Sequence, residues 1–514
     1  MMKKIIFLLI CVFLYGCKQP ETFTLNLIHT NDLHAHLLPF NEYGDCTADS
    51  RDCLGGFARI ISFMRREKSQ NPDSIILDAG DRFTGTSFYT LTKSRYLLPL
   101  FEMIPYDAAT LGNHEFDDNL NETVSFIGRW HTPILAANIL SSSKEPISQY
   151  IKPSMIIERN GRKIGIIGVT TPEINILGGA AIEITPIKQA VEAEIKKLKN
   201  QGINIIIVLS HISLTQDIKL AKALPDIDII VGGHSHSLLI NDKSVVHRRG
   251  EYPMTVNGGK TLIVSCGMGG QYVGKLQAEF NAAGEIINYN GDAVAMNIDI
   301  GADSAAVKII ADAQTELNNI LSEKIIELPQ SYGYTDGTDY CSQECPVGEY
   351  IAYLLAQEHP EVDGVIINSG AIRSALPHGT VTFNQILELY PYDNPAVIIE
   401  LSGKELKKFL RHGITHYHKR GKTNELLQTA GIRYEFTTDD KRIENITIKG
   451  KPLESDKTYR LLTSMFIANG GDRYPQKTYT ETGSTVREII VNQMKNPQNS
   501  VYQLEHNVQI IQNN

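Results

Sequence analysis

The chain has 514 residues, of which 42% are hydrophobic and 21% are charged, and its formal net charge is −9. This hydrophobic fraction excludes a chain that is disordered throughout, and the acidic balance argues against a protein that coats nucleic acid. At roughly 100–200 residues per domain, the length predicts two or three domains.

The N-terminus has the pattern of a lipoprotein export signal. Two lysines precede an apolar run, residues 5–14, which is too short to span a bilayer stably. The string Leu-Tyr-Gly-Cys that ends at Cys17 resembles a bacterial lipobox, whose cysteine becomes the lipid-modified first residue. An ordinary signal peptide is the alternative, but no equally good cleavage site is present. We therefore expect residues 1–17 to be a lipoprotein signal peptide with its lipobox, of which residues 1–16 are removed, and the protein to be exported to the bacterial periplasm or cell surface. The membrane would be contacted through the lipid anchor only, and Lys18 after the cysteine favours the outer membrane.

Of the seven cysteines, two lie in this signal and five remain. Cys46 and Cys53 bracket a polar loop, and Cys341 and Cys345 are separated by three residues. Two short-range disulfides fit an oxidising compartment. Zinc binding is the alternative, although thiolate pairs for zinc usually have two-residue gaps and a second pair. Cys266 lies in an apolar strand pattern and is expected to be a buried thiol.

The residues from about 23 to 300 repeat the order strand, loop, helix. Short apolar runs predict strands at 23–27, 74–78, 163–169, 204–209, 228–231 and 261–264. Helical spacing predicts helices at 57–64 and 187–198. A long helix at about 303–323 is either the linker between two domains or the last helix of the first. After it, the pattern predicts helices at 348–357 and 404–412 and a strand at 363–368.

The residues that follow these strands are of the types that bind metals. Five segments each place Asp, Asn or His just after an apolar run, and in open α/β sheets ligands bind at the carboxyl ends of strands. A lone histidine or aspartate there is more often structural, but five such segments together predict a site. Two divalent ions about 3.5–4 Å apart need a bridging carboxylate, for which Asp81 is the natural candidate. Besides Asp81, the expected ligands are Asp32, His34 and His236 for one ion and Asn113, His211 and His234 for the other.

The chemistry of this ligand set is rich in nitrogen. It suits zinc, manganese, iron or cobalt better than magnesium. His114 cannot easily share an ion with its neighbour Asn113. We therefore expect His114 to act as an acid or charge stabiliser at the leaving oxygen, with Asp117 three residues later orienting its ring.

The motifs resemble those of the calcineurin-like metallophosphoesterases and, more narrowly, the two-domain 5′-nucleotidases. The strings that carry the resemblance are His-Thr-Asn-Asp-x-His from His29, Gly-Asp at 80–81, Gly-Asn-His-Glu-Phe-Asp from Gly112, the single His211 and Gly-Gly-His-Ser-His from Gly232. The family assigns to these positions the metal and acid roles given above. The cysteine pair at 46 and 53 also resembles the animal ectoenzyme, whose early loop is bridged. The resemblance implies an α/β fold: a four-layer metallophosphoesterase sandwich at 22–300, a linker helix at 301–325 and a C-terminal α/β nucleotide-binding domain at 326–514.

The resemblance also implies how the second domain would bind a nucleotide. The family stacks the base between two aromatic side chains, holds the ribose with an aspartate and contacts the base or phosphate with an asparagine and an arginine. The matching residues are Tyr392 and Phe466 for the base, Asp472 for the ribose, and Asn368 and Arg373. The alternatives are that the two aromatics belong to the core and that the arginine pairs with a carboxylate. The stretch 340–344 lacks the arginines that the family often carries before its helix-start motif.

The function implied is hydrolysis of nucleoside 5′-monophosphates with two divalent metal ions, of which zinc, manganese or cobalt is expected. The enzymatic alternatives are a nucleotide-sugar or dinucleotide pyrophosphohydrolase and a 2′,3′-cyclic phosphodiesterase with 3′-nucleotidase activity. A different class is an inert nucleotide-binding surface lipoprotein. The expected partner is a nucleotide and not a nucleic acid, and the sequence leaves the oligomeric state open.

Overall fold

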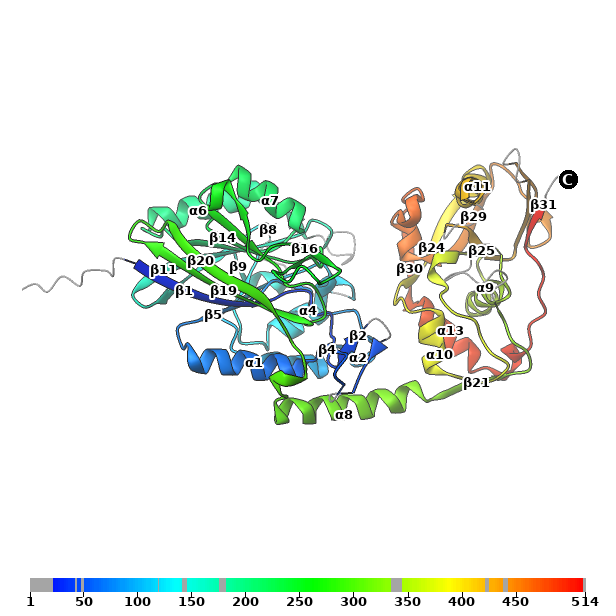
Figure 1. Ribbon diagram of the computed structural model, residues 1–514. Helices are drawn as coiled ribbons and strands as arrows, with labels where there is room; N and C mark the ends of the chain where they lie inside the picture. Colours follow the sequence, from blue (N-terminus) through cyan, green and yellow to red (C-terminus); the bar gives the residue numbers. More distant parts are fainter. Residues whose placement is uncertain are drawn as a thin grey trace, which may run out of the picture. The chain divides into compact units, whose positions relative to one another are not determined.

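The computed structural model describes most of the chain after the N-terminal signal. The described residues are 22–41, 44–47, 50–118, 120–140, 146–174, 182–333, 344–420, 425–437 and 442–511. The chain forms two compact units, residues 1–313 and 314–514, and their boundary lies within helix α8 (Ser304–Leu321) (Figure 1). Cys17 and Cys341 lie outside the described residues.

The first unit is built on two sheets. The seven-stranded sheet has the order β20-β19-β1-β5-β6-β7-β9. Its strands are β20 (Ile286–Ala295), β19 (Tyr272–Asn281), β1 (Thr22–Thr30), β5 (Ile75–Asp78), β6 (Ala108–Thr110), β7 (Ile134–Leu135) and β9 (Ile151–Lys152). From β1 to β9 the strands are parallel, and β19 and β20 are antiparallel additions at one edge. The polar loops that follow β1, β5 and β6 therefore emerge at the same edge of the sheet.

The second sheet of this unit has six strands in the order β10-β11-β13-β14-β18-β17. They are β10 (Ser154–Arg159), β11 (Arg162–Thr170), β13 (Ile206–His211), β14 (Ile229–Gly232), β18 (Thr261–Val264) and β17 (Met254–Val256). The strands from β11 to β18 are parallel, with an antiparallel strand at each edge.

The sheets and helices of the first unit pack in layers. In β13, Ile207 and Leu209 join the core between the two sheets, whereas Ile206 and Val208 pack under the outer helices. A parallel strand buried on both faces reads as a continuous apolar run, which is why the sequence predicts it well. Helices α6 (Ile187–Asn200) and α7 (Leu214–Ala223) lie on one side of the sheets and α1 (Phe57–Gln70) on the other (Figure 1). This is the expected four-layer arrangement.

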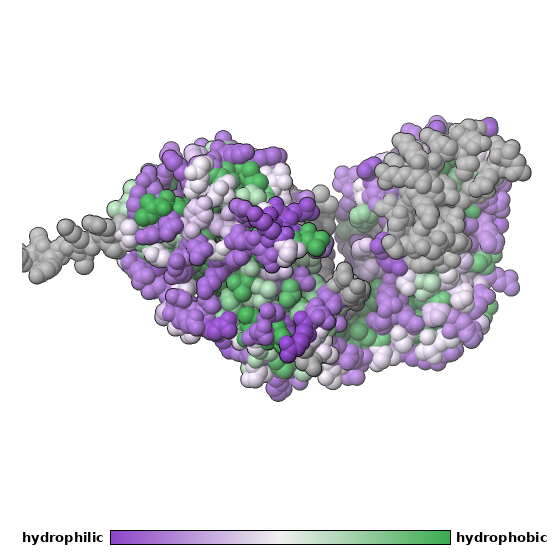
Figure 2. Space-filling view, in the orientation of Figure 1, coloured by the Kyte–Doolittle hydropathy of each residue, from purple (hydrophilic) through white to green (hydrophobic). Residues whose placement is uncertain are grey.

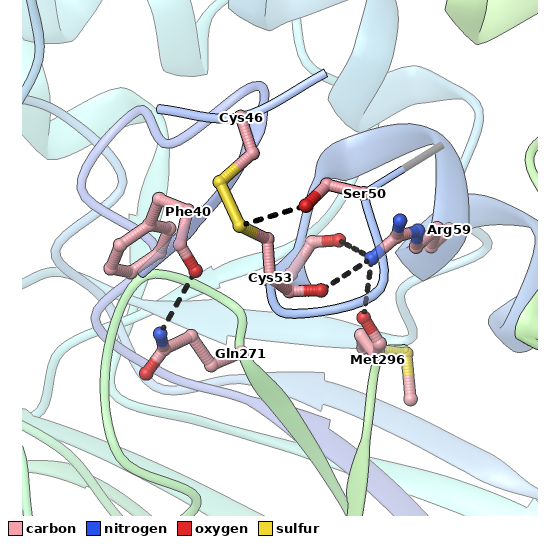
Figure 3. Close-up of a disulfide and its surroundings, with 8 residues drawn as sticks. Phe40, Cys46, Ser50, Cys53, Arg59, Gln271 and Met296 are labelled. Carbon is pink, nitrogen blue, oxygen red and sulfur yellow. Dashed lines mark hydrogen bonds between the residues drawn. A yellow bond between two sulfur atoms is a disulfide. The ribbon is translucent and has the colours of Figure 1, made fainter. Parts of the chain in front are cut away.

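A disulfide closes the loop between β3 (Gly44–Asp45) and β4 (Leu54–Gly55), just before α1. Cys46 and Cys53 are bonded, with their Cα atoms 6.4 Å apart (Figure 3). Arg59 of α1 donates from Nη1 to the carbonyl oxygens of Cys53, at 3.0 Å, and Met296, at 3.1 Å. The bridged loop is thus held against α1 and the chain that follows β20. Cys345 is also disulfide-bonded, and Cys266 is a buried free thiol, as expected.

The second unit has a five-stranded sheet in the order β25-β22-β29-β24-β30. Its strands are β25 (Leu427–Ala430), β22 (Gly364–Asn368), β29 (Thr458–Ser464), β24 (Pro395–Ser402) and β30 (Tyr479–Thr485). Helices α9 (Pro346–Glu358) and α13 (Val486–Met494) cover one face and α11 (Gly403–Arg420) the other. A four-stranded sheet, β28-β27-β26-β31, lies beside them. Its strands are β28 (Lys451–Pro452), β27 (Ile443–Ile448), β26 (Ile432–Thr437) and β31 (Val508–Ile511).

The surface shows hydrophobic residues scattered among many hydrophilic ones on the face drawn in Figure 2. Within the described part of the chain, no helix combines the length and the apolar character that a membrane crossing requires.

Candidate metal centre and nucleotide-contacting residues

The loops at the carboxyl ends of the parallel strands bring the predicted ligands into two groups that share Asp81. The ligand atoms of Asp32, His34, Asp81 and His236 lie within 4.8 Å of one another, and so do those of Asp81, His211 and His234. Asn113 joins the second group, since its Oδ1 lies 2.9 Å from Nδ1 of His234. The structure therefore brings all seven predicted ligands together around one shared carboxylate.

The histidine tautomers show that these groups fit a cation. The carbonyl oxygen of Thr84 can only accept, so the contact of 2.8 Å makes Nδ1 of His34 the donor. The contact of 2.7 Å between Nδ1 of His211 and the carbonyl of Ala79 does the same. When these two rings are neutral, as metal-bound histidines are, their Nε2 atoms carry the lone pairs. Nε2 of His34 faces Nε2 of His236 at 2.9 Å, and the buried Nε2 of His211 lies 3.0 Å from Asp81 Oδ2 without hydrogen-bond geometry. Imidazole nitrogens and carboxylate oxygens that lie this close together in a buried site form a donor set that fits a metal ion.

The backbone at this site is strained. Five of the ligands have positive φ angles, in the left-handed region that favours glycine: Asp32 (51°), His34 (47°), Asp81 (57°), His234 (75°) and His236 (50°). Each such residue costs on the order of 1–3 kcal/mol, and such strain gathers at functional sites.

The charges around the shared carboxylate favour its ionised form. Burial raises the pKa of Asp81, but His211 and His34 outweigh it and hold that pKa well below its usual range. Burial likewise lowers the pKa of His211, but Asp81 and Asp32 raise it to about 10. At the edge of the site, burial lowers the pKa of His236 to about 4, which keeps its ring neutral. Asp81 is thus a carboxylate at neutral pH, as a bridging ligand must be.

His114 lies next to the ligands but has a carboxylate of its own. Its Nδ1 is 2.5 Å from Asp117 Oδ2, and its backbone N–H donates to Asp81 Oδ1 at 2.9 Å. Its ring centroid is 5.0 Å from that of His34. Burial lowers the pKa of His114, but the hydrogen bond to Asp117 and the charge of Asp81 raise it to about 9. The protonated ring can donate a proton at Nε2.

Three further residues contact the predicted ligands or the loops that carry them, and the sequence does not predict a role for them. Asn31 donates from Nδ2 to Asp32 Oδ2 at 2.7 Å. Glu173 places Oε2 3.5 Å from Nε2 of His234. Glu115 accepts backbone N–H groups from the loops that carry Asp81 and Asn113. Asn31 and Glu115 lie within the sequence motifs quoted above, so their position could have indicated a role at the site. Nothing in the sequence marks Glu173.

In the second unit, the predicted ribose ligand is fixed by two side chains. Buried Asn368 donates from Nδ2 to Asp472 Oδ2 at 2.8 Å, and its own Oδ1 is buried with no hydrogen-bond partner among the described residues. His412 of α11 donates from Nε2 to the carbonyl of Asp472 at 2.9 Å, a contact that the sequence did not indicate. Asp472 and Arg473 both have positive φ, 51° and 64°.

The two predicted stacking residues are on the surface of this unit. Tyr392 is 44% exposed and Phe466 is 42% exposed, so neither is a core aromatic. A Cβ on Gly471 would overlap the ring of Phe466, which therefore lies directly over that glycine. Arg373 is exposed, and its Nη1 lies 3.5 Å from the carbonyl of Gly370. An exposed aromatic ring can accept a base by stacking.

Comparison with known proteins identifies the two units. Residues 25–238 match the calcineurin-like phosphoesterase family, and residues 327–479 match the 5′-nucleotidase C-terminal domain. An apyrase from Tabanus yao is 30% identical over 509 residues, covering 92% of this chain and 91% of its own. A snake venom 5′-nucleotidase from Naja atra is 30% identical over 490 residues, with 88% and 91% covered.

Solved structures agree. A 5′-nucleotidase precursor from Thermus thermophilus is 28% identical with a TM-score of 0.66, covering 95% of this chain and 99% of its own. Together with the metal-ligand geometry of the first unit, these relationships show a metal-dependent phosphoric monoester hydrolase, and the chain belongs to the 5′-nucleotidase family.

Proposed function

We propose that this protein is an exported 5′-nucleotidase that hydrolyses nucleoside 5′-monophosphates to nucleoside and phosphate with two divalent metal ions. The observation that carries the proposal is the pair of ligand groups joined by Asp81. One carboxylate shared by two groups is the arrangement that a two-metal phosphoesterase requires. The relatives named 5′-nucleotidase support the substrate class.

The residues of the first unit would bind the metal ions and donate a proton to the leaving group. The seven ligands would hold the ions, which supply an activated water and neutralise charge on the phosphoryl oxygens. The nitrogen-rich set favours zinc, manganese or cobalt. His114 would donate a proton from Nε2 to the leaving oxygen, while Asp117 holds its ring through Nδ1.

The residues of the second unit would bind the base, the ribose and the phosphate of the nucleotide. Tyr392 and Phe466 would stack on the base, and Asp472 would accept hydrogen bonds from the ribose hydroxyls. Among the described residues Oδ1 of Asn368 has no hydrogen-bond partner, so it would accept a hydrogen bond from the ligand. Arg373 would bind phosphate, because a guanidinium offers a planar pair of donors to an anion.

A substrate panel tests this proposal against its rivals. The metal-free protein would be supplied in turn with Mn²⁺, Zn²⁺, Co²⁺ or Mg²⁺ and assayed with AMP, ADP, UDP-glucose, NAD and 2′,3′-cyclic AMP. We expect adenosine and phosphate from AMP as the preferred reaction, and no turnover by Asp81→Asn. Because an apyrase is among the relatives, ADP is the most informative alternative substrate in the panel. A preference for ADP or UDP-glucose over AMP would reject the monophosphate assignment. Metal binding without turnover of any substrate would favour the inert binding protein.

We also propose that the mature protein starts at Cys17 and is held to the membrane by lipid on that residue. The lipobox pattern supports this, and the disulfide between Cys46 and Cys53 fits an oxidising compartment. Mass spectrometry of the protein from a bacterial membrane fraction should find Cys17 acylated at the N-terminus. We expect the Cys17→Ser variant to be released into the soluble fraction. An unmodified cysteine in the wild-type protein would refute the proposed lipid anchor.

A further inference from the structure

A buried carboxylate behind the metal ligands joins two loops of the first unit. Glu115 is 1% exposed. Its Oε1 accepts the backbone N–H of Arg82 at 2.6 Å. Its Oε2 accepts the N–H groups of Asp81, at 3.1 Å, and Gly112, at 2.5 Å. One side chain thus satisfies three backbone donors from two loops.

These two loops carry the shared carboxylate and its neighbours. Asp81 lies in the loop after β5, and Gly112 lies in the loop after β6, which also carries Asn113 and His114. The loops are in close contact, because a Cβ on Gly112 would overlap Asp81 Oδ1. The N–H of His114 donates to that same oxygen at 2.9 Å. The spacing of the ligands therefore depends on how these loops are held.

The carboxylate of Glu115 shares a buried guanidinium with a second carboxylate. The fully buried guanidinium of Arg82 places Nε 3.6 Å from Glu115 Oε1, and it donates from Nη2 to the carbonyl of Thr110 at 2.7 Å. It also pairs with Asp78, which is itself fully buried. A buried carboxylate is retained when it is paired and hydrogen-bonded. The Thr123 hydroxyl additionally donates to the backbone carbonyl of Glu115.

We propose that Glu115 is a positioning residue that fixes the separation between Asp81 and Asn113, and so sets the metal affinity of this centre. The inference rests on the proposed two-metal function. Glu115 itself would touch neither metal nor substrate, because both of its oxygens accept backbone N–H groups. It holds the loops so that the ligand atoms already lie together before an ion binds, which removes the cost of arranging them.

The test is metal affinity measured without turnover. Glu115→Gln keeps the volume and one acceptor oxygen, but its amide group would face backbone N–H donors that it cannot satisfy. We expect Mn²⁺ and Zn²⁺ to bind the metal-free variant about 10- to 100-fold more weakly than wild type, in competition with a fluorescent chelator. With Mn²⁺ at saturation, kcat for AMP and for p-nitrophenyl phosphate should fall by the same factor.

A matched carboxylate elsewhere in this unit provides the control. Asp228 accepts the backbone N–H of Ile206 at 2.7 Å, but it does so at the amino end of β14, away from the ligands. Asp228→Asn should lower the melting temperature without changing metal affinity. If Glu115→Gln fails to fold, Glu115→Asp replaces it, because the shorter side chain keeps the charge but cannot reach both loops. A Glu115 variant that folds and binds Mn²⁺ as wild type does would overturn the inference. Failure of the wild-type protein to bind either ion would instead reject the proposed function.

Discussion

The imidazole of His114 lies among the metal-ligand residues but is held by Asp117. Because this ring is not needed as a ligand, His114→Ala should lower kcat by about 10²- to 10⁴-fold, the usual contribution of a general acid. The metal content after dialysis should stay at the wild-type value. His236→Ala is the comparison variant and should lose metal together with activity. If His114→Ala also loses metal, His114 is a ligand and the assigned role is wrong.

Arg473 has an unfavourable backbone conformation, from which an effect on stability follows. Its φ of 64° lies in the left-handed region, which costs a non-glycine residue roughly 1–2 kcal/mol. Arg473→Gly should therefore raise the free energy of unfolding in urea by about 1 kcal/mol, whereas Arg473→Ala, which keeps a Cβ, should not. A stabilising effect of both variants would show that the side chain, and not the backbone, is unfavourable. The KM for AMP of the same variants separates a nucleotide contact, which would raise KM about tenfold in both, from a solvated surface residue, which would leave it unchanged.

Residues that end strands were predictable from the sequence, and the residues behind them were not. Asp81 and His211 follow apolar runs, so the parallel-sheet rule already places them at one edge. The contacts of Glu115 and Arg82 depend on which loops meet in three dimensions. Glu115 stands within a motif, but the motif does not indicate that its carboxylate accepts backbone N–H groups and lies beside Arg82.

At the scale of elements, the start of α8 illustrates how a helix is fixed to the first unit. Asp303 Oδ1 accepts the N–H groups of Ala305 and Ala306, at 3.0 and 3.1 Å. Its Oδ2 accepts a hydrogen bond of 2.8 Å from Arg65 of α1. Asp303→Ala should lower the free energy of unfolding by about 1–2 kcal/mol, the usual cost of losing a cap.

A matched substitution lies in the same helix. Asp312 pairs with Lys308 at 2.8 Å on the exposed surface. Asp312→Ala should cost at most about 0.5 kcal/mol, because exposed pairs four residues apart contribute little. Urea unfolding of both variants checks the difference. Equal losses would mean that capping does not anchor this helix.

For one element that the sequence missed, β20, the physical reason is clear. The expected strand at 261–264 and the long helix both appear, as β18 and α8. The ten-residue strand β20 was missed because it lies at the edge of its sheet, where most of its side chains are exposed or half-buried. An edge strand of this kind lacks the alternation of apolar and polar residues that predicts a strand.

At the scale of the whole molecule, the predicted metal ligands and the predicted nucleotide contacts belong to different units. The predicted metal ligands all come from the first unit, and the residues expected to contact the nucleotide all come from the second. Each unit has its own hydrophobic core. The family motifs predicted this separation, because each set of motifs stays within one half of the chain. The supporting contact from His412 could not be predicted, since a lone histidine in a helix has no distinguishing pattern.

This separation predicts that the stacking residue Phe466 matters only for substrates with a base. Phe466 is 42% exposed, so its loss leaves the core intact. If it stacks on the base, Phe466→Ala should raise KM for AMP by the equivalent of about 1–3 kcal/mol. Hydrolysis of p-nitrophenyl phosphate, which has no base, should hardly change.

Val501→Ala is the control, because Val501 is an apolar residue of the same unit that is 62% exposed. It should leave the KM for both substrates unchanged. Equal losses on AMP and p-nitrophenyl phosphate in Phe466→Ala would mean that the ring supports the catalytic reaction in general and does not read the base.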